Sequence, residues 1–112
     1  MSEYQNRAFD MLVTRYGMAQ AQDIESCRDR FLKDALGAYR AMGGTVEDGA
    51  EIFRQVLEEP TPRLGEAIGE VMGSIAGLSM ASDFDMMQVA YNTLAADESR
   101  RAMSRPRRLL GG

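Results

Sequence analysis

The stretch LGEAIGEVMGSIAGLSMASD, residues 64–83, decides the fold. Glycine recurs there at every fourth residue, and at about 100° per residue these glycines line one side of a helix. They form a stripe made of Gly65, Gly69, Gly73 and Gly77. Large aliphatic residues lie on roughly the opposite side: Leu64, Ile68, Val71, Ile75 and Leu78. A glycine inside a helix costs about 1 kcal/mol relative to alanine, so four in register predict a central helix packed on two faces, with a neighbouring backbone close to the glycine stripe.

A stripe of small residues also occurs in helices that cross membranes. Here Glu66 and Glu70 lie inside the stretch. The uncharged run of residues 71–82 is also shorter than the roughly 20 residues that a membrane span requires. The stretch therefore favours the centre of a water-soluble helical bundle or dimer, and we expect no membrane partner.

Composition narrows the chemistry available to the chain. Its 112 residues are the size of one domain, and 45% of them are hydrophobic, enough to supply a core. It has no histidine and a single cysteine, which excludes an internal disulfide, a serine–histidine–aspartate triad and histidine-bound zinc. Any metal would be held by carboxylates, which favours Mg²⁺ or Mn²⁺. The lone Cys27 and the polar start MSEYQNRAFD lead us to expect a cytoplasmic protein.

Helical periodicity runs along the chain, and no alternating strand pattern occurs. We predict helices over residues 3–16, 19–42 and 45–59, then over the glycine-striped stretch, and finally over residues 86–103. Start and stop signals bound them: Gly17, Gly43 and Gly44 as stops, Thr45 and Thr61 as caps, Pro62 as a first helical residue, and Ser82, Asp83 or Asp85 as the last cap. The sequence thus predicts an all-α bundle of four or five helices with antiparallel neighbours. We expect residues 1–103 to form one domain and residues 104–112 to form a flexible basic tail.

Apolar residues mark the faces of these helices. On the second helix one face carries Ile24, Phe31, Ala35, Ala38 and Met42. We expect Ile52, Phe53 and Val56 to form the buried side of the third helix. On the last helix we expect Val89, Leu94 and Met86 to face inward, and we expect Cys27 to be a small core residue.

Charge is unevenly distributed. The body through Ser99 holds eight basic and seventeen acidic residues, a formal charge of −9. The remainder holds five arginines: Arg100, Arg101, Arg105, Arg107 and Arg108. An acidic body is a poor platform for nucleic acid, so we do not expect a nucleic-acid partner. The arginines either contact phosphates or balance the acidic body, and the candidate phosphate-binding residues are Lys33, Arg100 and Arg101.

Acidic residues offer one candidate metal site. Acids four residues apart converge on one face of a helix, and facing helices of a bundle can hold Mg²⁺ between them. Glu66 and Glu70 have this spacing, and Asp34 lies on the long second helix, which could face them. These three are the candidate ligands if a metal site is retained. The same spacing is common on solvated helix faces, so both interpretations stay open.

Two long segments together resemble MazG-like proteins, especially the short forms carried by phages and prophages. In that family an aromatic–glycine pair ends a helix, and the matching pair here is Tyr16-Gly17. An Arg-Phe-Leu-Glu-Glu run follows in the family, and residues 30–34 match it here. The family's second half has a Glu-(Ile/Val)-Gly-Asp-Val run, a Gly-Ile-Asp-Leu-like turn and a final Asn-x-x-Arg. Residues 67–71, 83–86 and 97–100 match them. The resemblance covers about residues 8–103.

MazG-like proteins are all-α nucleoside triphosphate pyrophosphohydrolases that form dimers or larger assemblies. They release a monophosphate and pyrophosphate, with acids of two helices binding Mg²⁺. The metal neutralises phosphate charge and lowers the pKa of the attacking water. The resemblance therefore implies a MazG-like bundle completed by dimerisation, with Mg²⁺ as cofactor wherever the site functions.

The acidic motifs of the family are altered in this chain. The first acidic motif of the family is Glu-Glu-x-x-Glu, and its three acidic positions are occupied here by Lys33, Asp34 and Gly37. The second motif is Glu-x-x-Asp, and its two acidic positions are occupied by Ala67 and Glu70. A lysine among the ligands repels the cation. Glu66 could replace the acid missing at Ala67, but it lies about 100° around the helix. We therefore predict a degenerate metal site and assign no catalytic residue.

Two functional hypotheses follow. The first is a non-catalytic or weakly active MazG-like protein that binds a nucleotide or a protein partner, with a role in phage counter-defence implied by the resemblance. The second is an active Mg²⁺-dependent nucleoside triphosphate pyrophosphohydrolase with a rearranged acid set: Asp34, Glu66, Glu70 and Asp97. The altered first motif favours the first hypothesis. The two-faced central helix and nine methionines also predict a homodimer or higher oligomer.

Overall fold

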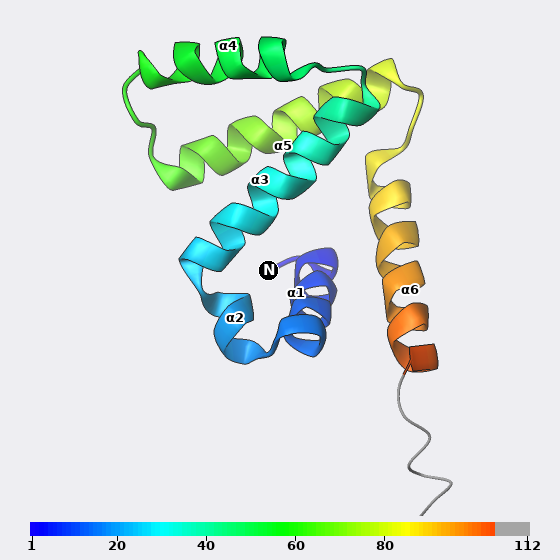
Figure 1. The fold of residues 1–112 in the computed structure, drawn as a ribbon. Coiled ribbons are helices and arrows are strands. Elements are labelled where there is room, and N and C mark those ends of the chain that lie inside the picture. The colour runs from blue at the N-terminus through cyan, green and yellow to red at the C-terminus, as the bar shows by residue number, and fades with distance from the viewer. Residues whose placement is uncertain (105–112) are drawn as a thin grey trace, which may run out of the picture.

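The computed structural model describes residues 1–104, and the regular structure in this range is entirely helical (Figure 1). Its helices are α1 (Glu3–Tyr16), α2 (Met18–Gln22), α3 (Ile24–Ala41), α4 (Val46–Leu57), α5 (Leu64–Ala81) and α6 (Met86–Ser104). The predicted all-α class is confirmed for this part of the chain. None of these helices is long and apolar enough to cross a membrane. Apart from Ser104, the predicted tail lies outside the described residues.

Local capping sets the bounds of the first three helices. Gly17 ends α1 with φ of +85°, a conformation that glycine adopts without a steric penalty. The prediction of one helix over residues 19–42 is wrong, because the chain breaks at Asp23. The Asp23 carboxylate accepts hydrogen bonds from the backbone N–H and the hydroxyl of Ser26, at 2.9 and 2.7 Å. This cap starts α3 and turns it away from α2.

The predicted capping residues of α4 and α6 cap these helices in the structure, whereas those of α5 do not. Thr45 caps α4 as predicted, accepting a hydrogen bond of 3.2 Å from the N–H of Asp48. Asp85 caps α6, accepting one of 2.8 Å from the N–H of Gln88. The predicted start of α5 at Thr61 and Pro62 is wrong, because Arg63 is extended and α5 begins after it without a side-chain cap. Solvent can satisfy the first N–H groups of such an exposed helix end.

A small core joins α1, α2 and α6. Met11, Ala21 and Leu94 are its buried apolar residues, so the inward position predicted for Leu94 is confirmed. Val89, also predicted to face inward, exposes 38% of its surface. Helix α6 packs on α1, so the first and the last helix of the described region lie side by side.

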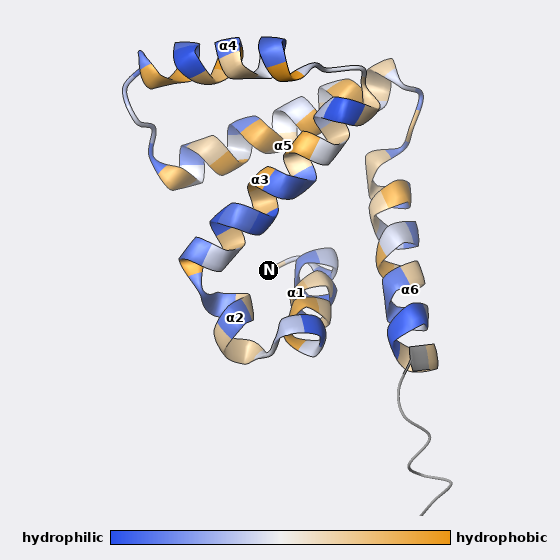
Figure 2. Cartoon of the chain, viewed as in Figure 1, coloured by the Kyte–Doolittle hydropathy of each residue, from blue (hydrophilic) through white to orange (hydrophobic). Residues whose placement is uncertain are grey.

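Helices α3, α4 and α5 are open beside this core (Figure 1). Within the described residues the backbone of α4 lies close to no other helix, and the backbones of α3 and α5 stay apart, although the Tyr39 ring of α3 lies beside Gly49 of α4. Hydrophilic and apolar residues separate onto opposite sides of α4 (Figure 2). The large apolar side chains of these helices that are exposed leave 38% to 84% of their surface open: Ile24, Phe31, Leu32, Leu36, Val46, Ile52, Phe53, Val56, Leu57, Leu64, Ile68, Met72, Ile75 and Met80. The predicted burial of the apolar side of α4 is therefore wrong for a single chain.

The dimensions of the chain agree with this openness. Its radius of gyration is 17.2 Å, whereas a compact domain of this length has a value of about 13 Å. Helices α1–α6 of residues 1–104 do not close into a bundle within one chain. Closure of the predicted bundle thus requires contacts that a single copy does not make.

Candidate functional site

The three candidate metal ligands lie on two separate helices. Asp34 is on α3, whereas Glu66 and Glu70 are on α5, and all three are exposed. Because α3 and α5 do not pack on each other, one chain does not bring Asp34 to the glutamates. No group of three or more acidic or cysteine residues that could hold a metal occurs among residues 1–104. The carboxylates of one chain therefore do not fit Mg²⁺ as a site.

Asp97, the fourth acid of the alternative set, has a different setting. It lies on α6 and forms an ion pair with Arg100, one helical turn further on. It also lines a pocket of about 480 Å³ together with Arg15, Arg100 and Arg101. This acid is therefore part of an arginine-rich site at the ends of α1 and α6.

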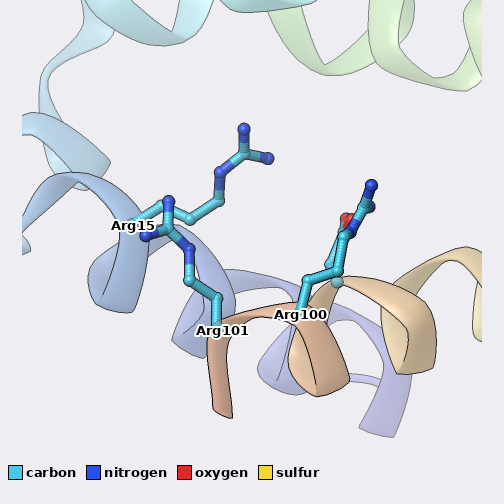
Figure 3. Close-up of a pocket in the computed structure, with 4 residues that line it drawn as sticks. Arg15, Arg100 and Arg101 are labelled. Carbon is cyan, nitrogen blue, oxygen red and sulfur yellow. The ribbon is translucent and has the colours of Figure 1, made fainter. Parts of the chain in front are cut away.

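Three arginines converge on that pocket from helices far apart in sequence (Figure 3). The side chains of Arg15 and Arg101 lie next to each other, and Arg100 projects from the other side. We call this arginine pocket the α1–α6 pocket. It includes Arg100 and Arg101, two of the three predicted phosphate-binding residues. Lys33 lies on α3 and is not among the lining residues.

Arg15 was missed by the sequence analysis. It lies in the last turn of α1, one residue before the aromatic–glycine pair. Its guanidinium stacks over the Tyr16 ring at 5.2 Å, and Arg30 of α3 stacks over the same ring at 4.8 Å. Cation–π contacts of this kind hold a guanidinium near a helix end. Gly17 marks the end of α1 in the sequence. No local pattern in the sequence shows that α6 packs beside this end of α1, so Arg15 could not be predicted as a pocket residue.

Contacts along α1 and α6 hold the pocket together. The rings of Tyr4 and Tyr91 meet edge to face with centroids 5.4 Å apart. Arg7 and Glu98 form an ion pair of 2.7 Å, and Arg7 also lies over the Tyr91 ring. The hydrogen bond from Arg7 to Glu98 is the main cause that raises the pKa of Arg7 above its ordinary value. The Arg7 guanidinium therefore stays charged throughout the ordinary pH range.

The glycine stripe of α5 has no close neighbour in the described chain. A Cβ atom added at Gly65, Gly69, Gly73 or Gly77 would meet no atom within 4 Å. The close approach predicted for this stripe is thus not made by a helix of the same chain, and packing against another chain stays a prediction. Cys27 is half-buried, with its Sγ 3.4 Å from the carbonyl oxygen of Ala21.

Comparison with protein-family models, with curated proteins and with solved structures finds no match for this chain. The resemblance to MazG-like proteins therefore rests on the motifs of the sequence alone.

Proposed function

We propose that the chain is a MazG-like helical protein without effective catalysis, which assembles with itself and acts by binding a protein or a nucleotide. The observation that carries this proposal is the exposure of the apolar sides of α3, α4 and α5. Contiguous exposed apolar surface on a folded chain marks an interaction site. A cytoplasmic location is part of the proposal and is supported by the single cysteine, which suits a reducing compartment.

The accessible area of the chain supports assembly. It is 9547 Å², whereas a compact monomer of 12.4 kDa exposes about 6,100 Å². The eight residues outside the described range, if fully extended, could contribute about 1,300 Å² at most, at roughly 1.45 Å² per dalton. An excess of about 2,100 Å² remains, and an ordinary interface buries only about 800 Å² per partner. The excess matches what an obligate dimer buries.

A second copy of the same chain is the partner that best fits this surface. Each copy lacks cover for the same three helices, so one isologous contact would bury the apolar sides of both. The opposite side of α4 is suited to solvent, since it carries an exposed ion pair of 2.7 Å between Arg54 and Glu51. The bare glycine stripe of α5 would let a backbone of the second copy approach closely.

The altered acidic motifs support the absence of effective catalysis. A dimer could place α3 of one copy near α5 of the other and so bring Asp34 toward Glu70. Lys33, Gly37 and Ala67 would still stand at three of the five acidic positions of the family. Two carboxylates beside a lysine form a weak site for Mg²⁺, because the lysine charge opposes the metal charge.

Two experiments test the proposal. The purified chain is incubated with a panel of nucleoside triphosphates and Mg²⁺ or Mn²⁺, and pyrophosphate release is measured. We expect release no greater than in the protein-free blank. Robust release that Asp34→Ala and Glu70→Ala both abolish would instead establish the alternative, an active Mg²⁺-dependent pyrophosphohydrolase.

The second experiment measures mass by light scattering at tens of micromolar. We expect twice the chain mass of 12.4 kDa or a higher multiple. A mass equal to one chain at this concentration would contradict self-assembly.

A further inference from the structure

We infer that two copies cover the open apolar surface of α3, α4 and α5 by a reciprocal exchange, in which α4 of each copy packs against α3 and α5 of the other. This inference rests on the proposed function, because it takes a second copy as the partner, and it adds which helix of that copy covers which. The competing arrangement pairs the two α4 helices with each other.

Helix α4 is joined to the rest of its chain only at its two ends. Residues 42–45 link it to α3 and residues 58–63 link it to α5, and its backbone lies close to no other helix among residues 1–104 (Figure 1). Five large side chains on its apolar side are each at least half exposed: Val46, Ile52, Phe53, Val56 and Leu57. An amphipathic helix is stable when its apolar side packs against another surface, and the described part of its own chain provides none.

The Tyr39 side chain fills the corner between α3 and α4. A Cβ atom added at Gly44 would collide with its ring, and one added at Gly49, near the start of α4, would lie 3.5 Å from the ring. Links as short as residues 42–45 usually join helices that pack antiparallel along their length. Here an aromatic ring lies against the start of α4, and the two backbones do not approach each other. The apolar side of α3 is therefore left free for a helix of another copy.

Charge favours contact of α4 with α3 and α5 over contact of α4 with α4. Residues 46–59 hold one basic and five acidic residues, a formal charge of −4. Two α4 helices side by side would bring two such charges together, and like charges repel. Helix α3 holds four basic and three acidic residues, a charge of +1, and α5 holds two acidic residues and no basic one. The exchange thus places α4 against helices of opposite or lower charge.

The area left open on one copy agrees with the exchange. Helix α4 has 12 residues and spans about 18 Å, so a contact of α4 with α4 alone would leave the apolar side chains of α3 and α5 in solvent. The exchange covers all three helices, and two-fold symmetry forms each contact twice. The excess of about 2,100 Å² over a compact monomer is larger than the roughly 800 Å² of an ordinary interface, which favours the exchange.

The test joins cysteines on two differently tagged chains that are expressed together. Every chain carries Cys27→Ser and one new cysteine, and a short bismaleimide links thiols that lie close to each other. We expect Val56→Cys on α4 of one chain to link to Ile68→Cys on α5 of the other and, in a separate pair, to Phe31→Cys on α3. Each link gives a band of two chains that carries both tags. The matched control is Gln55→Cys on the polar side of α4, which should lose both bands.

Light scattering separates the inference from the proposal on which it rests. A mass of one chain for the wild-type protein overturns both. An oligomer in which Val56→Cys links to Val56→Cys of the second copy, or lacks its link to either Ile68→Cys or Phe31→Cys, overturns the exchange alone. A link within one chain that carries both Val56→Cys and Ile68→Cys also overturns it, because α4 would then close onto its own α5. Variants that fail to assemble are replaced by a neighbour with the same decisive outcomes: Leu57→Cys for α4, Met72→Cys for α5 and Leu32→Cys for α3.

Discussion

Arg7 of α1 donates a hydrogen bond of 2.7 Å to Glu98 of α6, across 91 residues of sequence. Both side chains are 38% exposed, and the Tyr4–Tyr91 ring contact lies on the same pair of helices. Few long-range contacts exist in the open chain, so this pair is a principal tie between its two ends. The same two helices also carry Arg15 and Arg101, which line the α1–α6 pocket.

We predict that Glu98→Gln lowers the melting temperature of the protein by a few degrees. The substitution leaves the Arg7 guanidinium without its acid, and partly exposed ion pairs make small contributions to stability. Thermal denaturation followed by circular dichroism measures the change. The control is Glu51→Gln, which breaks the more exposed Arg54 pair within α4 and should have less effect. Equal changes in melting temperature for the two variants would show that the Arg7–Glu98 pair contributes no more to stability than an exposed ion pair within one helix.

The Asp23 cap predicts a dependence of stability on pH. Hydrogen bonds from the hydroxyl and then the backbone N–H of Ser26 are the main causes that lower the pKa of Asp23 below its ordinary value. The folded state thus favours the ionised carboxylate. Its contribution is present above the unfolded pKa of about 3.9 and is lost as the pH falls through the lower folded value.

Asp23→Ala should therefore lower the melting temperature at pH 7, and the difference from the wild-type protein should shrink as the pH falls below about 4. Melting curves from pH 7 to pH 3 measure this. Ser26→Ala removes the hydroxyl but keeps the backbone donor, so it should show a smaller difference of the same pH dependence. A difference between Asp23→Ala and wild type that is constant over the whole range would contradict the assignment.

Local signals in the sequence predicted much of the helical structure. Gly17, Thr45 and Asp85 act at the predicted ends because the chemistry of a cap lies within a few residues. Asp23 was overlooked since it stands inside a continuous helical pattern, where an aspartate could equally face solvent. Thr61 and Pro62 carried a valid start signal, but the chain stays extended through Arg63.

Contacts between helices that are distant in the sequence could not be predicted from capping residues and helical periodicity. The periodicity of α4 correctly identifies its apolar side, yet periodicity does not specify which surface covers that side. Arg100 and Arg101 could be selected as phosphate candidates from charge alone. Arg15 could not, because its proximity to them depends on the return of α6 to α1.

Self-assembly through α4 predicts that Phe53→Glu reduces the mass of the protein to that of one chain. Phe53 lies on the apolar side of α4 and is 61% exposed in a single copy. A carboxylate there would have to be dehydrated in an interface, which is unfavourable without a partner for its charge. Light scattering measures the mass, and circular dichroism checks that helices persist.

The matched control is Met103→Glu, at an exposed residue on α6 away from the open helices. This variant should assemble like the wild-type protein. Retention of the oligomer by Phe53→Glu, with its helix content unchanged, would exclude the apolar side of α4 from the interface.

Substitution of Gly73 distinguishes a glycine stripe that faces solvent from one that packs against a second copy. In an isolated chain a Cβ atom at Gly73 meets nothing within 4 Å, so alanine should stabilise α5 by about 1 kcal/mol through its greater helix propensity. In an assembly that packs a backbone against the stripe, the same methyl group would push the copies apart. We predict the second outcome, with Gly73→Ala weakening association and Gly73→Leu weakening it further. Sedimentation over a dilution series measures the dissociation constant, and a stabilised α5 with unchanged association would show that the stripe faces solvent.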